Sequence, residues 1–293
     1  FLIKTNNFYL AILCRFIIGA TSAVGFLATS KILMQWFDST RYAKMVGFSF
    51  SFGLLGAVYA GKPITMLIAQ FNYQTIGYAL ALIALLLSIF ILIFLRSPQK
   101  DEYTAEPFFS LPSLLSLIRS RQLWVLALAN LLMVGALEGF ADVWGVSYLV
   151  NAYQLTKSDA AFVCSFVFVG MIFGGPLLAY FSRRIGNYWV LIFSSIGLSL
   201  ALFLILTNML SAQWQLMLVL FFVGILCCYQ VIVFATGSNM VASNQQGLCV
   251  AFLNCINMLG GSFFHTLIGQ AMNLYWQGKV DNAGIKVYTL YAY

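Results

Sequence analysis

The chain has 293 residues, of which 62% are hydrophobic and only 8% charged, with 15 Lys and Arg against 8 Asp and Glu. A soluble domain carries about 25% charged residues, so these few charges cannot cover a surface in water. The composition predicts an integral membrane protein and excludes disordered, collagen-like, coiled-coil and disulfide-stapled secreted classes. The net charge of +7 does not indicate nucleic-acid binding, because Lys and Arg are scattered at the ends of apolar blocks.

Apolar stretches follow one another along the whole chain. They cover residues 8–36, 45–70, 75–95, 122–150, 158–182, 188–207, 215–237 and 247–274. The last three belong to a run of 94 residues, Ile185 to Gly278, without Asp, Glu, Lys or Arg. One helix of that length would measure ~140 Å against a hydrocarbon core of ~30 Å, so the run must cross the membrane several times. In lipid, the backbone N–H and C=O groups of a spanning segment must form their hydrogen bonds within that segment, as an α-helix does. The runs therefore predict an all-α integral membrane fold with about eight transmembrane helices.

One long polar stretch, residues 96–121, divides these spans into three and five. We expect residues 1–95 to be the end of an N-terminal helical bundle, residues 96–121 to be a linker, and residues 122–293 to form a second bundle of five helices. The odd number of spans before the linker, and an apolar tail at the end of the chain, suggest that both bundles are incomplete.

Lys and Arg in the connections between spans set the expected orientation. One side of the membrane holds eight of them, namely Arg41, Lys44, Arg96, Lys100, Arg119, Arg121, Arg183 and Arg184. The other side holds four, namely Lys4, Lys157, Lys279 and Lys286. Because cytoplasmic loops carry the excess of positive charge, we expect a multi-pass protein of the inner or plasma membrane with the 96–121 loop in the cytoplasm.

Few ionisable side chains lie inside the spans, where each costs ~2.5 kcal/mol or more at the bilayer centre. Arg15 lies about two turns into the first span, and Lys62 precedes Pro63, where we expect a kink. Glu138 and Asp142 lie one turn apart in the fourth span, and two such carboxylates do not readily ionise together, which suits proton exchange. The alternative for each is a structural role, such as an arginine bonded to carbonyls or a carboxylate pair held by a cation for packing.

The last span carries a polar stripe about three turns long, formed by Asn254, Asn257, Gly261 and His265. A single histidine on such a helix either packs in the interior with its ring hydrogen-bonded or carries protons. The six cysteines lie in apolar stretches without metal-ligand spacing, so we expect neither a metal nor a cofactor. One histidine and no nucleophile paired with a base also argue against an enzyme.

Two short motifs stand out in this chain. The first span contains Arg15-Phe-Ile-Ile-Gly19, and the fifth span ends in a glycine-rich segment and a basic turn with Gly174, Gly175, Arg183, Arg184 and Gly186. The first motif is similar to the R-x-x-x-G pattern of the fourth helix in the major facilitator superfamily of membrane transporters. The second resembles the junction of helices eight and nine in that family.

The resemblance implies two six-helix bundles joined by a cytoplasmic loop, with the eight spans corresponding to helices four to eleven. We therefore expect the native product to be longer by about three spans before Phe1 and one span after Tyr293, and the 293-residue chain alone to be inactive in transport.

The resemblance also implies secondary active transport of a small polar solute by alternating access, with proton-coupled symport. In that family the cavity is lined by helices one, four, seven and ten, which would place there Arg15, Glu138 with Asp142, and Tyr229 with Gln230. The cations Arg15 and Lys62 favour an organic anion, a sugar phosphate or a peptide-like solute. A drug-efflux carrier, and a non-transporting receptor or scaffold with the same fold, are the alternatives.

Overall fold

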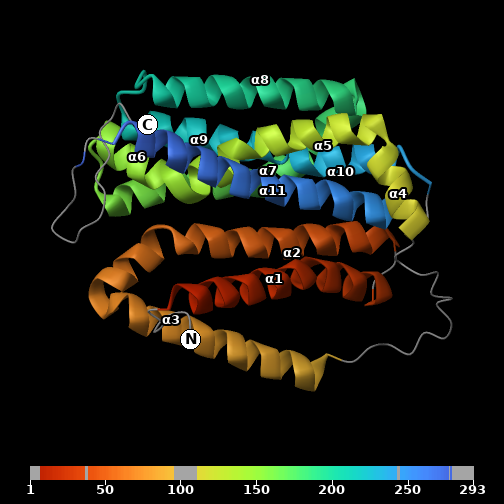
Figure 1. Cartoon of the computed structure of the whole chain (residues 1–293), viewed down its shortest axis with the longest axis horizontal. Helices are drawn as coiled ribbons and strands as arrows, with labels where there is room; N and C mark the ends of the chain where they lie inside the picture. Colours follow the sequence, from red (N-terminus) through yellow and green to blue (C-terminus); the bar gives the residue numbers. More distant parts are fainter. Residues whose placement is uncertain (1–6, 37–38, 96–110, 243–244, 277, 279–293) are drawn as a thin grey trace. The chain divides into compact units, whose positions relative to one another are not determined.

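The computed structural model describes residues 7–36, 39–95, 111–242, 245–276 and 278, except for some side chains in the first three helices. All regular elements in this part of the chain are helices, which confirms the all-α prediction (Figure 1). The chain forms two compact units: unit 1 contains residues 1–53 and 63–104, and unit 2 contains residues 54–62 and 105–293.

Unit 1 is built from α1 (Phe8–Trp36), most of α2 (Ser39–Ala60) and α3 (Lys62–Phe94). The helix break before Pro63 falls where the sequence predicts a kink. A second break lies at Asn72, whose φ of 66° and ψ of 161° are not helical. The side chain of Asn72 caps the second half of α3 by accepting a hydrogen bond from the Thr75 backbone N–H at 2.9 Å. The break explains why two predicted spans meet near this residue.

Unit 2 holds the remaining helices, which run along one another (Figure 1). In chain order they are α4 (Leu111–Arg119), α5 (Arg121–Met133), the 3₁₀ turn η1 (Val134–Ala136), the π-helix η2 (Leu137–Trp144), α6 (Gly145–Ala152), α7 (Lys157–Ile185), α8 (Asn187–Leu206), α9 (Gln213–Cys227), α10 (Tyr229–Ser238) and α11 (Gln246–Leu274). The helix α4 lies inside the segment expected as a linker.

Six helical segments of the described chain are long and apolar enough to cross a membrane. They are Pro63–Phe94, Arg121–Ala152, Lys157–Ile185, Asn187–Leu206, Gln213–Ser238 and Gln246–Leu274. A shorter apolar helix covers Phe8–Ser22. The last five segments agree with the five spans predicted after residue 121. The chain is thus a multi-pass membrane bundle, as its composition predicts.

The helices α7 and α9 pack backbone against backbone because glycines face each other. A Cβ atom added to Gly170 would overlap the carbonyl oxygen of Phe221, and one added to Gly224 would overlap the carbonyl oxygen of Val167. One turn further, a Cβ atom on Gly174 would lie 2.6 Å from the carbonyl oxygen of Ile225. Small residues allow this approach, and dispersion contacts then hold helices together in a medium as apolar as their side chains.

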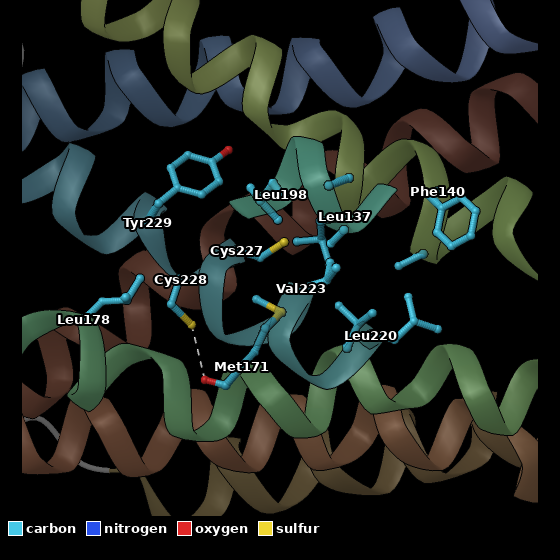
Figure 2. Packing of buried hydrophobic residues seen from close by; sticks show 14 of the residues in the cluster. Leu137, Phe140, Met171, Leu178, Leu198, Leu220, Val223, Cys227, Cys228 and Tyr229 are labelled. Atoms are coloured by element: carbon cyan, nitrogen blue, oxygen red, sulfur yellow. Dashed lines mark hydrogen bonds between the residues drawn. The ribbon is translucent and has the colours of Figure 1, made fainter. Parts of the chain in front are cut away.

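The core of unit 2 surrounds this helix pair, as Figure 2 shows. Leu220, Val223 and Cys227 of α9 are fully buried among side chains of the neighbouring helices. Cys228, at the break between α9 and α10, donates a hydrogen bond from Sγ to the carbonyl oxygen of Met171 at 3.3 Å (Figure 2). Both cysteines are free thiols packed in this core.

The turn between α7 and α8 is made by Gly186, whose φ of 90° favours glycine. Its backbone N–H donates to the carbonyl oxygen of Ser182 at 2.9 Å and closes α7. Arg183 and Arg184 are exposed in the last turn of α7, where positive charge interacts favourably with the helix dipole. The guanidinium of Arg184 lies 5.6 Å from the centre of the Tyr180 ring.

The close contact of α7 and α9 predicts a large effect of one added methyl group. We expect Gly224→Ala to lower the thermal stability of the full-length protein by the cost of overpacking, about 1–3 kcal/mol or more, because the Cβ atom meets backbone that cannot rotate away. Gly175→Ala is the matched control, since an added Cβ atom there meets no heavy atom within 4 Å. The measurement is thermal unfolding in detergent, and equal melting temperatures of the two variants would contradict the packing described here.

Candidate functional site

The segment from Arg121 to Ala152 is one membrane-length helix whose middle is irregular. It changes from α to 3₁₀ at Val134, to π at Leu137, and back to α at Gly145. The backbone N–H of Gly145 donates to the carbonyl oxygen of Phe140, five residues earlier, as a π-helix requires. Such wide turns often occur at functional sites, and both Glu138 and Asp142 lie in this one.

Helix α11 packs against the π-helix and forms the other wall of the site. His265 Nε2 lies 2.7 Å from the backbone carbonyl oxygen of Glu138. Because a carbonyl oxygen only accepts hydrogen bonds, Nε2 carries the proton and donates. Gly261, one turn before His265, leaves room for the Glu138 side chain, since a Cβ atom there would lie 3.0 Å from Glu138 Oε2.

The two carboxylates of the π-helix have different surroundings. The side chain of Glu138 is half-buried against α11, whereas that of Asp142 is exposed on the surface of unit 2. Asp142 follows Glu138 by four residues in the same π-helix, and His265 of α11 lies against the backbone of Glu138. Three ionisable groups that the sequence places on two separate spans therefore lie together as one cluster, although their roles stay predictions.

A second polar group lies deeper in unit 2, where α5, α10 and α11 meet. The hydroxyl of Tyr229 is fully buried and donates to the carbonyl oxygen of Asn130 at 3.1 Å. The Asn130 side-chain amide in turn donates to the carbonyl oxygen of Leu253 at 3.4 Å. Asn257, one turn after Leu253, is also fully buried. Sequence reasoning missed Asn130, although a lone amide inside an apolar span is a signal that could have identified it.

Other predicted site residues lie elsewhere. Asn254 is exposed on α11, so the polar stripe divides into a buried and an exposed part, and Gln230 is half-buried on α10. Arg15 is exposed on α1 in unit 1, and the side chain of Lys62 lies outside the described part of the chain. The expectation that Arg15 and Glu138 line one cavity stays a prediction.

Two glycines of the motifs are not required by close packing within the described residues. A Cβ atom added to Gly19 or to Gly175 would meet no heavy atom within 4 Å. Gly174 contacts α9 directly and Gly186 adopts a positive φ, so the local structure requires glycine at these two positions. The motif at the end of α7 thus combines one packing glycine and one turn glycine.

An apolar cavity of about 730 Å³ opens between the α5–α6 segment, α8 and α11. Its walls include Phe140, Leu198 and Phe264, and the lining side chains that carry a polar atom are Trp144, Tyr148, Ser195 and Ser199. None of the predicted site residues lines it. Its chemistry suits an alkyl or aromatic group better than a polar solute.

Carboxylate, imidazole and thiol groups do not cluster as metal ligands do. Within the described ranges, no group of three or more His, Cys, Asp or Glu side chains could hold a metal ion. The cluster of Glu138, Asp142 and His265 can exchange protons and accept or donate hydrogen bonds, which is the chemistry that these side chains offer at membrane depth.

Comparison with known proteins agrees with this architecture. Among solved structures, the chain is similar to a bacterial homologue of the human lysosomal transporter Spinster in an inward-facing, unoccupied conformation, with a TM-score of 0.63 and 14% sequence identity. The similarity covers 85% of this chain and 60% of that one, so the chain spans about three fifths of that transporter's length. No curated protein matches the sequence.

The sequence itself carries the family signature along nearly its whole length. The family model described as Major Facilitator Superfamily matches residues 1–273. The resemblance inferred from the two motifs is therefore confirmed, and it agrees with the helical membrane architecture and with the fold of the Spinster homologue. The chain belongs to the Major Facilitator Superfamily.

Proposed function

We propose that the complete protein is a secondary active transporter that moves a small polar solute by alternating access, coupled to protons. Membership of the Major Facilitator Superfamily and the similarity to a bacterial homologue of a lysosomal transporter support the transport part of this proposal. The observation that carries the coupling part is the position of Glu138, a half-buried carboxyl group in a π-turn of a membrane helix, beside His265.

Glu138 is the proposed proton carrier because its surroundings favour a change of charge during transport. Gly261 leaves space for the Glu138 carboxyl group. The imidazole of His265 lies nearby because it donates a hydrogen bond to the backbone carbonyl oxygen of Glu138. A neutral carboxyl group crosses low-dielectric surroundings at lower cost than a carboxylate. Binding and release of one proton at this side chain would therefore couple to the opening of the site on either side.

The proposed solute class follows from the cations of unit 1. Arg15 is a permanently charged group on a membrane helix, and a guanidinium binds carboxylate or phosphate through two parallel hydrogen bonds. Lys62 would add a second positive charge. We therefore favour an organic anion, a sugar phosphate or a peptide-like solute, taken up by symport with protons.

A drug-efflux carrier is the second candidate, and the apolar cavity of about 730 Å³ favours it. Aromatic and aliphatic walls of this kind bind lipophilic compounds. A receptor or scaffold without transport is the remaining alternative. A panel of organic acids, sugar phosphates, dipeptides and lipophilic cations, tested on the full-length protein in liposomes with and without a pH gradient, separates these functions.

The proton-carrier proposal predicts the effect of removing the Glu138 charge. With the solute found in the panel, Glu138→Gln should abolish accumulation driven by a pH gradient, because the amide binds no proton. Exchange of labelled for unlabelled solute at equal pH should continue, since it needs no net proton movement. Asp159→Asn is the matched control, because that carboxylate accepts a hydrogen bond from Thr156 at the start of α7, outside the site.

Gradient-driven accumulation that is unchanged in Glu138→Gln would overturn the assignment of the proton carrier. If that variant behaves normally and Asp142→Asn loses accumulation, the carrier is the exposed carboxylate instead. Absence of movement of any compound in the panel, together with measurable binding, would favour the receptor.

The role of Arg15 generates a separate prediction about solute charge. Arg15→Gln should raise KM for anionic solutes by about 10- to 100-fold, the loss of a charged hydrogen-bonding partner worth about 1.5–3 kcal/mol. Arg15→Lys should recover part of this loss, because it restores the charge but not the bidentate geometry. Initial uptake rates over a range of concentrations give KM, and an unchanged value in both variants would contradict an anion-binding role.

A further inference from the structure

Two asparagine side chains lie completely buried in the interior of unit 2. Asn130 of α5 and Asn257 of α11 each have no exposed area. The Oδ1 atom of Asn130 and both polar side-chain atoms of Asn257 have no hydrogen-bond partner among the described residues. Buried amide groups are almost always hydrogen-bonded in native proteins, so three such atoms in one place need a partner.

The contacts between α5 and α11 place the two asparagines at the same level of the bundle. The Asn130 amide donates to the carbonyl oxygen of Leu253, one turn before Asn257. Gly260, which follows Asn257 by three residues, contacts Leu131 and Val134. Asn257 therefore lies between two points at which α11 touches α5.

A third helix closes this part of the interior. The hydroxyl of Tyr229, on α10, donates to the backbone carbonyl oxygen of Asn130 at 3.1 Å. Tyr229 and Leu253 have no exposed area, so bulk solvent does not reach the asparagines directly. Along α11, Asn257 is followed one turn later by Gly261, which contacts the Glu138 side chain.

The chemistry of the unpaired atoms identifies the ligand. Asn130 Oδ1 and Asn257 Oδ1 accept hydrogen bonds, and Asn257 Nδ2 donates them. A water molecule offers two donors and two acceptors and typically makes about three hydrogen bonds when buried. A cation would be repelled by the Nδ2 hydrogens, and an anion by the two carbonyl oxygens.

We propose that Asn130 and Asn257 hold bound water inside unit 2, where α5, α10 and α11 meet. This proposal does not depend on which solute is carried or on whether transport is coupled to protons. Asn257 lies one helical turn along α11 from Gly261, the residue that contacts the Glu138 side chain.

Pulsed X-ray radiolysis with mass spectrometry tests this proposal, because hydroxyl radicals formed from bound water oxidise the side chains around it. The sample is the full-length protein in lipid nanodiscs. Leu253 and Leu220 form a matched pair, since both are leucines without exposed area and only Leu253 lies beside the asparagines. We expect oxidation of Leu253 to exceed that of Leu220 by at least fivefold. The Tyr229 ring reacts faster with hydroxyl radicals than a leucine does, so its oxidation is compared only with that of Tyr229 in the variants.

Variants then connect the oxidation to the two amides. Asn257→Leu and Asn130→Leu should each reduce oxidation of Leu253 to near the level of Leu220, and should lower oxidation of Tyr229 relative to the unaltered protein. Asn254→Leu is the control, because that asparagine is exposed on the same helix and should leave the pattern unchanged. Oxidation of Leu220 also reports folding, since a variant that opens the core would raise it.

Two results would overturn the proposal. Oxidation of Leu253 as low as that of Leu220 in the unaltered protein would show a dry interior. Unchanged oxidation of Leu253 and Tyr229 in both leucine variants, with Leu220 still protected, would show water that the asparagines do not hold.

Discussion

The close approach of α7 and α9 is the constraint on which the rest of unit 2 depends. Without side chains at Gly170 and Gly224, the two backbones touch, and the neighbouring helices take their positions around this pair. In a bilayer the hydrophobic effect does not drive helices together, so such contacts supply specificity that a soluble core obtains from burial. The polar contacts of α5, α10 and α11 therefore lie in a framework fixed by packing.

The irregular middle of the Arg121–Ala152 segment is possible because it is covered by protein. Non-helical backbone is tolerated at membrane depth where neighbouring elements or polar partners satisfy it. Here His265 donates to the Glu138 carbonyl oxygen, and the absence of a side chain at Gly261 makes room for the carboxyl group. The Arg121–Ala152 segment supplies the Glu138 carboxyl group, and α11 supplies the hydrogen bond and the space beside it. Neither element alone therefore forms the site.

Much of the fold follows from the sequence, because long apolar runs separated by short polar or charged turns leave little freedom in a membrane. The structure agrees with the sequence in three places: the five segments after residue 121, the break before Pro63 and the turn at Gly186. The contact between Glu138 and α11 could not be read from spacing, since it joins residues 127 positions apart. The π-helix was also missed, because helical-wheel arguments assume 3.6 residues per turn throughout.

The same π-helix has a consequence for how this segment tolerates changes in length. A wide turn contains one residue more than an α-turn needs, so deletion of a single residue within Leu137–Trp144 would leave a chain able to form a continuous α-helix. Because the removed residue is the surplus one, the residues after the deletion would keep nearly their orientation relative to α5. Tyr148, whose hydroxyl donates to the Ile205 carbonyl oxygen at 3.1 Å, would then keep its anchor on α8. A deletion in the regular α-helix of α5 has no wide turn to absorb it and would rotate Tyr148 by about 100° away from that anchor, so the π-helix is the place where this membrane helix tolerates a change of one residue in length.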